Sequence, residues 1–254
     1  MIFFPLGDYI SLIDCTFDDV RMAQQQMASV KQDTTIREYQ AFVEGVYGKS
    51  NDRFFTLWDM VSNFERFMTR SLKGIRKNNS EKTKINLLIT LSWFMSTMNQ
   101  LHIDLEDKVW KRFPYLCSYC GTCPCSCKKE KLTKRRKIIR EGKMKPRTLE
   151  EYQNMFEKIY PSKKRTVEHA GIHLAEEAGE FSEALLTYYG GHRNIDFKNL
   201  EIEAADFFSC LMTLSNSLKI NLAKELSKIF SKNCHVCKNA PCTCSFRSIT
   251  TFKS

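Results

Sequence analysis

The alternation of apolar and polar positions is helical over most of the chain. In two segments, 34–116 and 148–233, apolar residues recur three and four positions apart with few prolines between them. Both segments begin with Thr-x-x-Glu, at Thr35 and Thr148, a capping-box pattern that marks a helix start. A chain of 254 residues with only 10 glycines and 6 prolines fits the same interpretation. The sequence therefore predicts an all-α protein.

The two segments resemble each other, which indicates an internal duplication of about 95 residues with three or four helices per copy. TIREYQAFVEGVY in the first segment returns 113 residues later as TLEEYQNMFEKIY, and a second stretch matches with an offset of 117. The identical pairs are Thr35/Thr148, Glu38/Glu151, Tyr39/Tyr152, Gln40/Gln153, Glu44/Glu157 and Tyr47/Tyr160, then Ser92/Ser209, Met95/Met212, Asn99/Asn216, Leu101/Leu218, Ile103/Ile220, Leu105/Leu222 and Phe113/Phe230.

The second copy carries five acids in two groups. Glu176, Glu177 and Glu180 lie in HLAEEAGEFSEAL, and Glu203 and Asp206 lie in LEIEAADFFSCLM. Each group contains a pair at i,i+3 on one helix face, among apolar neighbours that indicate an inward orientation. Carboxylates that face one another in such a cleft raise each other's pKa unless a cation such as Mg²⁺ or Mn²⁺ neutralises them. An acidic surface stripe is the alternative.

The first copy has lost all of these acids. With the offset of 114 in the first acidic region and 117 in the second, the five acids align with Ser62, Asn63, Arg66, Asn86 and Ile89. The first copy keeps the pattern of core residues, so it is predicted to be a structural partner of the second copy and not a second catalyst.

The spacing Glu-Glu-x-x-Glu, 22 residues, Glu-x-x-Asp resembles the signature of the MazG-like all-α nucleotide pyrophosphohydrolases, over about residues 148 to 232. The resemblance implies Mg²⁺-dependent hydrolysis of a nucleoside or deoxynucleoside triphosphate to the monophosphate and pyrophosphate. It also implies that Glu177, Glu180, Glu203 and Asp206 bind Mg²⁺ or Mn²⁺. Glu176 would then activate the attacking water or complete the shell of a second metal ion.

Enzymes of this family are generally oligomers, which implies two MazG-like helical bundles packed as an intramolecular pseudo-dimer, with further homo-oligomerisation as an additional expectation. Two independent bundles are the alternative. Candidate substrate-binding residues are Lys163, Lys164, Arg165, Lys224 and Lys228 for the phosphates, and Tyr188 and Tyr189 for the base. His169 and His173 lie at i,i+4 and could reach the cleft, although such histidines are more often packing residues.

Each copy ends in a cysteine cluster with the pattern C-x2-C-x4-C-x-C. The two sets are Cys117, Cys120, Cys125 and Cys127, and Cys234, Cys237, Cys242 and Cys244. Four thiolates at this spacing can close a tetrahedron around Zn²⁺, so residues 117–127 and 234–254 are predicted to be zinc knuckles. An iron–sulfur cluster and disulfides are alternatives. Cys123 is an extra thiol, His235 could replace one ligand, and Cys15 and Cys210 are predicted to be core residues.

The net charge of +10 comes almost entirely from residues 128–147, which contain 11 Lys or Arg and 2 Glu. Such a linker attracts phosphates and polyanions, so nucleic acid is a candidate partner. The linker has no interleaved aromatic residues for base stacking, and a solvated linker has the same composition. The alternative function is therefore a zinc-containing nucleic-acid-binding or nucleotide-sensing regulatory protein that uses the MazG-like scaffold without hydrolysis.

No run of 18 apolar residues occurs, so no membrane span is predicted. The opening stretch MIFFPLGDYISLID has no basic start and contains Asp8 and Asp14, which is unlike a signal peptide. We therefore expect a cytoplasmic protein without a membrane partner. Residues 1–33 are interpreted as an N-terminal extension without an assigned function.

Overall fold

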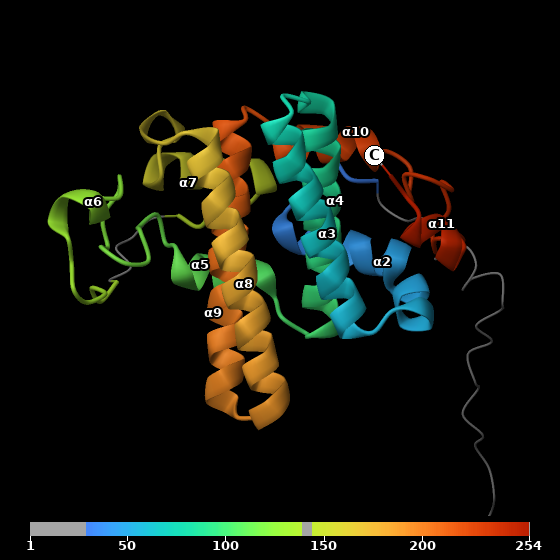
Figure 1. The fold of residues 1–254 in the computed structure, drawn as a ribbon, viewed down its shortest axis with the longest axis horizontal. Helices are drawn as coiled ribbons and strands as arrows, with labels where there is room; N and C mark the ends of the chain where they lie inside the picture. The colour runs from blue at the N-terminus through green and yellow to red at the C-terminus, as the bar shows by residue number, and fades with distance from the viewer. Residues whose placement is uncertain (1–28, 139–143, 254) are drawn as a thin grey trace, which may run out of the picture.

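The computed structural model describes residues 29–138 and 144–253, and all regular secondary structure in these ranges is helical (Figure 1). The prediction of an all-α protein is confirmed. Of the N-terminal extension only residues 29–33 are described, and Cys15 lies outside the described residues. The helices are α2 (Ile36–Phe54), α3 (Leu57–Arg76), α4 (Ser80–Gln100), α5 (Leu105–Arg112), α6 (Cys127–Glu130), α7 (Leu149–Ile159), α8 (Val167–Gly191), α9 (Asn194–Ser217), α10 (Leu222–Ile229) and α11 (Phe246–Thr250), with a 3-10 turn at Ser162–Lys164.

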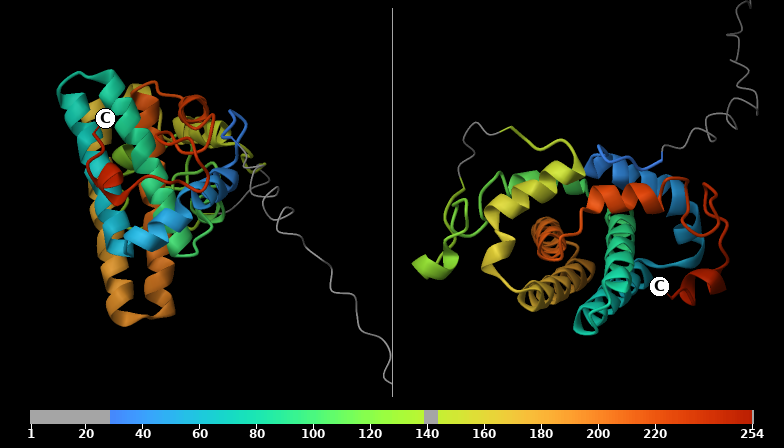
Figure 2. Two further views of the ribbon diagram at one scale, coloured as in Figure 1. Left: turned by 90° about the vertical axis from the view of Figure 1, so that its right-hand side faces the viewer. Right: turned by 90° about the horizontal axis from the view of Figure 1, so that it is seen from above.

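The helices follow one another in the same order in the first half, 29–138, and in the second half, 144–253. In both halves a first helix (α2 or α7) precedes a long helical hairpin (α3 and α4, or α8 and α9), a short helix (α5 or α10) and a cysteine-rich segment. Seen from above, the four long helices stand together in the middle, with the shorter elements around them (Figure 2). The first cysteine-rich segment and the second lie on opposite sides of the molecule (Figure 1).

The sequence determines where the first helix of each half begins. The Thr35 hydroxyl accepts a hydrogen bond from the Glu38 N–H, and the Glu38 carboxylate accepts one from the Thr35 N–H. Thr148 and Glu151 form the same reciprocal pair at the start of α7. Both predicted capping boxes are therefore present, and such a cap typically stabilises a helix by about 1 kcal/mol.

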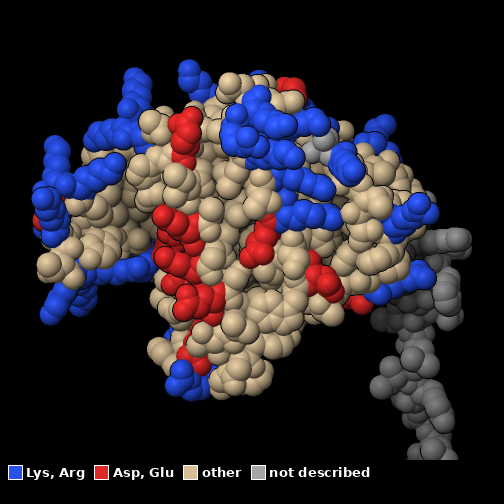
Figure 3. All heavy atoms as spheres, in the orientation of Figure 1, with Lys and Arg blue, Asp and Glu red and all other residues tan. Residues whose placement is uncertain are grey.

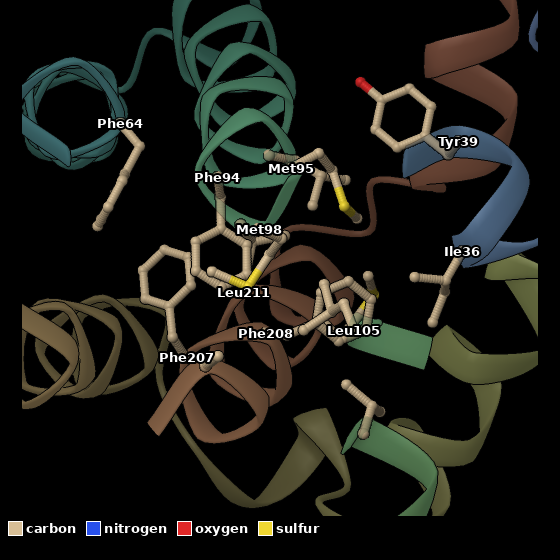
Figure 4. Packing of buried hydrophobic residues seen from close by; sticks show 14 of the residues in the cluster. Ile36, Tyr39, Phe64, Phe94, Met95, Met98, Leu105, Phe207, Phe208 and Leu211 are labelled. Atoms are coloured by element: carbon tan, nitrogen blue, oxygen red, sulfur yellow. The ribbon is translucent and has the colours of Figure 1, made fainter. Parts of the chain in front are cut away.

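The two hairpins share one hydrophobic core. Phe64 of α3, Phe94 of α4 and Phe207 of α9 are fully buried and pack ring against ring (Figure 4). The ring centroids of Phe94 and Phe207 are 4.5 Å apart, and those of Phe64 and Phe207 are 5.3 Å apart. Buried aromatic contacts of this kind contribute through both area and geometry. The alternative of two independent bundles is therefore wrong, because aromatic side chains from both halves fill the same core.

A glutamine ties three segments together in each half, and it is buried in the second half (Gln153) and half-buried in the first (Gln40). In the second half, the Gln153 side chain donates to the Ile220 carbonyl at 2.7 Å and accepts from the Leu222 N–H at 3.0 Å, and its own carbonyl accepts from the Asn216 amide at 3.0 Å. Gln40 makes the same three bonds in the first half, to Ile103, Leu105 and Asn99 at 2.8, 3.3 and 3.0 Å. The identical residues found in the sequence thus make identical interactions.

Each cysteine-rich segment packs against the first helix of the other half. The Cys125 N–H donates to the Ile159 carbonyl at the end of α7, at 2.8 Å, and the Cys242 N–H donates to the Val46 carbonyl in α2, at 2.7 Å. The aromatic residues that precede the clusters also pack against the other half. Phe113 packs on Phe156 and Tyr160, and Phe230 packs on Phe42 and Tyr47. Neither half therefore completes its own packing.

We expect Gln153→Leu and Gln40→Leu each to lower the free energy of unfolding by about 2–4 kcal/mol, because each change leaves buried backbone N–H and C=O groups without a partner. Urea denaturation measures this. Gln100→Leu, the same change at an exposed position near the end of α4, is the matched control and should stay within about 0.5 kcal/mol of the parent. Three equal, small effects would contradict the structural role of the glutamines.

Candidate functional site

One face of α8 carries a row of side chains that changes from cationic to anionic. Arg165 precedes the helix, and His169, His173, Glu177 and Glu180 follow three or four residues apart, so they line one face. The rings of His169 and His173 stack with centroids 4.4 Å apart. This face points toward α9, because α8 and α9 form one hairpin. The basic end and the acidic end of the row are therefore parts of one surface.

Three glutamates from α8 and α9 converge at the acidic end of this row. Carboxylate oxygens of Glu177, Glu180 and Glu203 all lie within 4.8 Å of one another. In an octahedral Mg²⁺ site with Mg–O distances of about 2.1 Å, adjacent oxygens are about 3.0 Å apart and opposite oxygens about 4.2 Å apart. The three carboxylates would therefore have to move closer together by side-chain rotation to bind one ion. The i,i+3 spacing of the sequence thus brings carboxylates of two helices together.

The electrostatics of these glutamates favour a cation. Burial, reinforced by the neighbouring carboxylate of Asp206, raises the pKa of Glu177 to about 8 and that of Glu203 to about 7. One oxygen of Glu177 is buried, and none of the described residues donates a hydrogen bond to it. A buried carboxylate oxygen without a donor is unfavourable unless it binds a proton or a positive ion. The donor set suits a hard divalent cation, which takes oxygen ligands.

Asp206, predicted to be a fourth metal ligand, is instead held by an arginine from the first half. Arg112 of α5 donates to both carboxylate oxygens, at 3.0 Å from Nε and 2.7 Å from the terminal nitrogen. Both side chains are largely buried. At the equivalent positions, 117 residues apart, the pair is replaced by Ile89 and Ile229. This bidentate ion pair therefore joins the two halves beside the acidic cluster and has no counterpart at the equivalent positions.

A cavity of about 690 Å³ opens between α8, α9 and the first cysteine-rich segment. Its volume lies in the range of small-molecule sites in proteins. Figure 3 shows the surface on which it opens, with acidic side chains in a column over α8 and α9 and basic side chains gathered beside them over α6. The charged and titratable residues lining the cavity are Lys128, Lys129, Arg135, Lys164, Arg165, His169, His173, Glu177 and Asp206, and its floor includes Phe113, Tyr160, Ser209, Cys210 and Thr213.

Each cysteine cluster brings four sulfur atoms to the separations expected around one ion. In the first cluster Cys117 and Cys127 are 3.7 Å apart and Cys120 and Cys125 are 3.9 Å apart. Four sulfurs at 2.3 Å from a tetrahedral Zn²⁺ are about 3.8 Å apart. The second cluster, Cys234, Cys237, Cys242 and Cys244, has separations of 3.5 to 4.0 Å. Both clusters can hold zinc.

The four-cysteine sets are those predicted, without Cys123 or His235. His235 instead contacts the Tyr47 hydroxyl through Nδ1 at 3.2 Å. All ten described cysteines are free thiols, so the disulfide alternative is wrong for them. Burial opposes ionisation of Cys120, but hydrogen bonds from Thr122 and from the backbone of Ser126 lower its pKa to about 5. A thiolate is the form that binds metal.

The structure does not place Glu176 in the cavity. Glu176 is exposed and lines a shallow groove between α8 and α3, with Leu72 and Arg76. The reason is angular, because adjacent residues point about 100° apart around a helix, and Glu177 takes the inward direction. Glu176, the predicted catalytic residue, thus lies outside the cavity that contains Glu177.

Several predicted substrate contacts also lie elsewhere. Lys224 and Lys228 are on α10, where Lys228 pairs with Glu225 at 2.6 Å, and they do not line the cavity. Tyr188 packs on Phe197 and Tyr189 packs on Trp58, at the far end of α8. Eight residues of helix separate Tyr188 from Glu180, about 12 Å along the axis. Of the three basic residues before α8, Lys164 and Arg165 line the cavity and Lys163 does not.

The first half contains a twin of this cavity that is almost closed. Tyr47, Ser92 and Phe230 stand where Tyr160, Ser209 and Phe113 line the open cavity, but the remaining volume is only about 80 Å³. Ser248, Ile249 and Phe252 of the C-terminal segment line it from the other side. The twin cavity is therefore apolar and too small for a nucleotide.

One of the acids is replaced by a basic side chain beside the twin cavity. Arg66, aligned with Glu180, donates to the Thr250 carbonyl at 2.9 Å, and Arg70, one turn further along α3, donates to the Phe252 carbonyl at 3.0 Å. These arginines hold residues 250–252 against α3. At the position of Glu180, the first half thus uses a side chain to bind another segment of the same chain.

The sequence did not predict two sets of residues at or beside the cavity. Arg112 gives no local signal, because its partner Asp206 lies 94 residues away. Lys128, Lys129 and Arg135 were interpreted as part of a linker, since their composition alone does not show which way they face. The only available signal was their position directly after a cysteine cluster.

We expect purified protein to contain about two zinc ions per chain by elemental analysis, one for each four-cysteine cluster. Cys120→Ser and Cys237→Ser should each lower the content to about one and reduce thermal stability, because structural zinc sites contribute folding free energy. Cys210→Ser, which changes a cysteine outside both clusters, is the control. A metal-free protein from a preparation without chelator would contradict the assignment.

Stability without added Mg²⁺ should fall as pH rises from about 5 to 8. The folded pKa of Glu177, about 8, lies above the ordinary value of 4.5, so the folded state binds more protons in this window. Urea midpoints of zinc-loaded protein at several pH values test this. Glu177→Gln should flatten the profile, whereas Glu168→Gln, an exposed acid on the same helix, should not. Parallel profiles for all three proteins would contradict the buried, raised pKa.

No helix among the described residues is long and apolar enough to cross a membrane. Comparison with known protein families, with curated proteins and with solved structures finds no match. The resemblance to the MazG-like enzymes therefore rests on the acidic motif and its spacing.

Proposed function

We propose that the protein hydrolyses a nucleoside or deoxynucleoside triphosphate to the monophosphate and pyrophosphate, with Mg²⁺ bound by Glu177, Glu180 and Glu203. The observation that carries this proposal is the convergence of the three carboxylates within 4.8 Å beside a cavity of about 690 Å³. The motif Glu-Glu-x-x-Glu and Glu-x-x-Asp, typical of MazG-like enzymes, supports the same reaction. In this proposal the fold is a MazG-like pseudo-dimer whose first copy is degenerate.

A metal ion held by Glu177, Glu180 and Glu203 would supply charge compensation for the phosphates and for the transition state. The three glutamates would position the α-phosphate only through that ion, because carboxylates and phosphates repel each other directly. Their raised pKa values mean that binding a cation displaces protons from Glu177 and Glu203 near neutral pH. Substrate binding and carboxylate ionisation are therefore coupled.

Asp206 is a positioning residue in this proposal. Its ion pair with Arg112 fixes the carboxylate and places a positive charge beside the glutamates. Burial and the carboxylate of Asp206 raise the pKa of both Glu177 and Glu203, and Arg112 offsets part of that rise. The first half thereby contributes Arg112 to the charge balance of the site. This gives a physical reason for a degenerate copy to be kept in the same chain.

His173 replaces Glu176 as the candidate general base. Burial and the neighbouring His169 lower the pKa of His173, so its imidazole is neutral at pH 7 and can accept a proton. In the reaction, the oxygen of water bonds to the α-phosphorus and the bond to the α,β-bridging oxygen breaks. The bonding electron pair leaves with pyrophosphate, and the water proton passes to His173. The ring lies one helical turn from Glu177 on the same face of α8.

Pyrophosphate release from a panel of ribo- and deoxyribonucleoside triphosphates in Mg²⁺ tests the proposal. The double variant Glu177→Gln/Glu203→Gln should lower kcat by at least about 100-fold, because it removes two of three ligands of the metal ion. The matched control is Glu168→Gln/Glu176→Gln, which makes the same charge change at two glutamates of α8 that line the groove beside α3 and not the cavity.

Full activity in the ligand variant would exclude the site. Loss of activity in the control variant would return the catalytic role to Glu176. The alternative function, nucleic-acid binding or nucleotide sensing on the same scaffold, would show binding without pyrophosphate release from any nucleotide in the panel.

A further inference from the structure

The wall of the cavity opposite α8 is built from the first half. Lys128 and Lys129 follow the ligand cysteine Cys127 directly, and Arg135 follows them, and all three line the same cavity as Glu177. The proposed reaction assigns no role to these cations. All three side chains are exposed to solvent, so they line the open rim of the cavity and can reach a ligand that binds there.

This basic segment is folded back onto the first cysteine cluster. The Arg136 N–H donates to the Tyr119 carbonyl at 2.9 Å, and the Tyr119 hydroxyl donates to the Leu132 carbonyl at 3.1 Å. The Arg135 guanidinium lies 5.8 Å from the centre of the Tyr119 ring. Arg136 also pairs with Glu130. Residues 128–136 are therefore positioned by the cluster and do not form a free linker.

Cationic residues of the wall and of the segment before α8 both affect the pKa of His173. Burial and His169 lower the pKa of His173, and two further contributions in the same direction come from Arg165, before α8, and from Lys128, on the wall. One end of the cavity therefore has cationic residues on both of its walls. The other end, where Glu177 lies, is anionic.

The cations are specific to the open cavity. With the offset of 117, Ser245 and Phe246 stand after the second cluster where Lys128 and Lys129 stand after the first. The segment that begins at Ser245 closes the twin cavity with its own side chains. The segment after the first cluster instead leaves the cavity open and lines it with positive charge.

We propose that the first cysteine cluster and the basic residues Lys128, Lys129 and Arg135 form the polyphosphate-binding wall of the site, which holds the β- and γ-phosphates of the substrate and then the pyrophosphate product. This inference rests on the proposed hydrolysis for the identity of the substrate. A nucleoside triphosphate carries more negative charge than one divalent cation offsets, and the glutamates repel its distal phosphates. Lysine and arginine provide charge-assisted hydrogen bonds to phosphate oxygens.

The rival occupant is a nucleic-acid strand along the outer surface of the same basic segment. Such a strand would contact Lys134 and Lys137, which are exposed and do not line the cavity. The two lysine pairs therefore separate the possibilities, since Lys128→Gln/Lys129→Gln and Lys134→Gln/Lys137→Gln remove the same charge from the two faces of one segment.

The experiment measures the Kd of pyrophosphate in Mg²⁺ by titration calorimetry, with zinc-loaded full-length protein. Lys128→Gln/Lys129→Gln should weaken binding by at least about 10-fold, because hydrogen bonds between charged groups are among the strongest. Lys134→Gln/Lys137→Gln should stay within about 2-fold, since its charges do not line the cavity and act on a ligand there only through screened, longer-range attraction. Equal zinc content and thermal midpoints confirm that both variants fold.

Each result decides the inference. It is overturned if the parent protein does not bind pyrophosphate, if both variants lose affinity equally, or if only single-stranded RNA binding changes. If the parent hydrolyses nucleotides while Lys128→Gln/Lys129→Gln keeps its KM and pyrophosphate affinity, the wall is wrong and the proposed function stands. If the parent releases no pyrophosphate from any nucleotide but binds pyrophosphate through Lys128 and Lys129, the wall stands and the hydrolysis is wrong.

Discussion

The structure depends on the exchange of cysteine clusters between its two halves. Each cluster follows the short helix of one half and bonds to the first helix of the other, through Cys125 to Ile159 and through Cys242 to Val46. Because the exchange is reciprocal, the chain cannot be divided into two complete units. It also places a rigid, metal-competent segment of the first half over α8 and α9. The open cavity, its basic wall and its acidic end all follow from this arrangement.

The same backbone plan gives two different cavities, and side chains alone make the difference. Beside the open cavity, Glu180 faces other carboxylates and the site favours a cation. Beside the twin cavity, Arg66 occupies the aligned position and binds the carbonyl of Thr250. Carboxylates that repel one another are stabilised by a proton or a cation, whereas a guanidinium can be satisfied by backbone carbonyls of the same chain. One half is therefore suited to a ligand, and the other uses the C-terminal segment in its place.

Charge balance across the two halves explains why the acidic site is compatible with folding. Asp206 would add a further negative charge to Glu177 and Glu203, but Arg112 from the other half neutralises it through two short hydrogen bonds. A buried carboxylate that is paired costs far less than an unpaired one. The remaining negative charge, together with burial, raises the pKa of Glu177 and Glu203. Protons can thus offset the negative charge of the site, and in the proposed function a cation would take their place.

The sequence by itself determined the features that depend on local spacing. Helix starts at capping boxes, cysteine sets at fixed intervals, and glutamates at i,i+3 are all properties of a few consecutive residues, and the structure contains each of them. Tertiary structure decided the partners that lie far apart in the chain. Arg112 reaches Asp206, the basic wall closes over α8, and α10 carries Lys224 away from the cavity, because packing between helices, and not periodicity, sets which faces meet. Periodicity places a side chain on a face of its helix, and only the shared core decides what that face contacts.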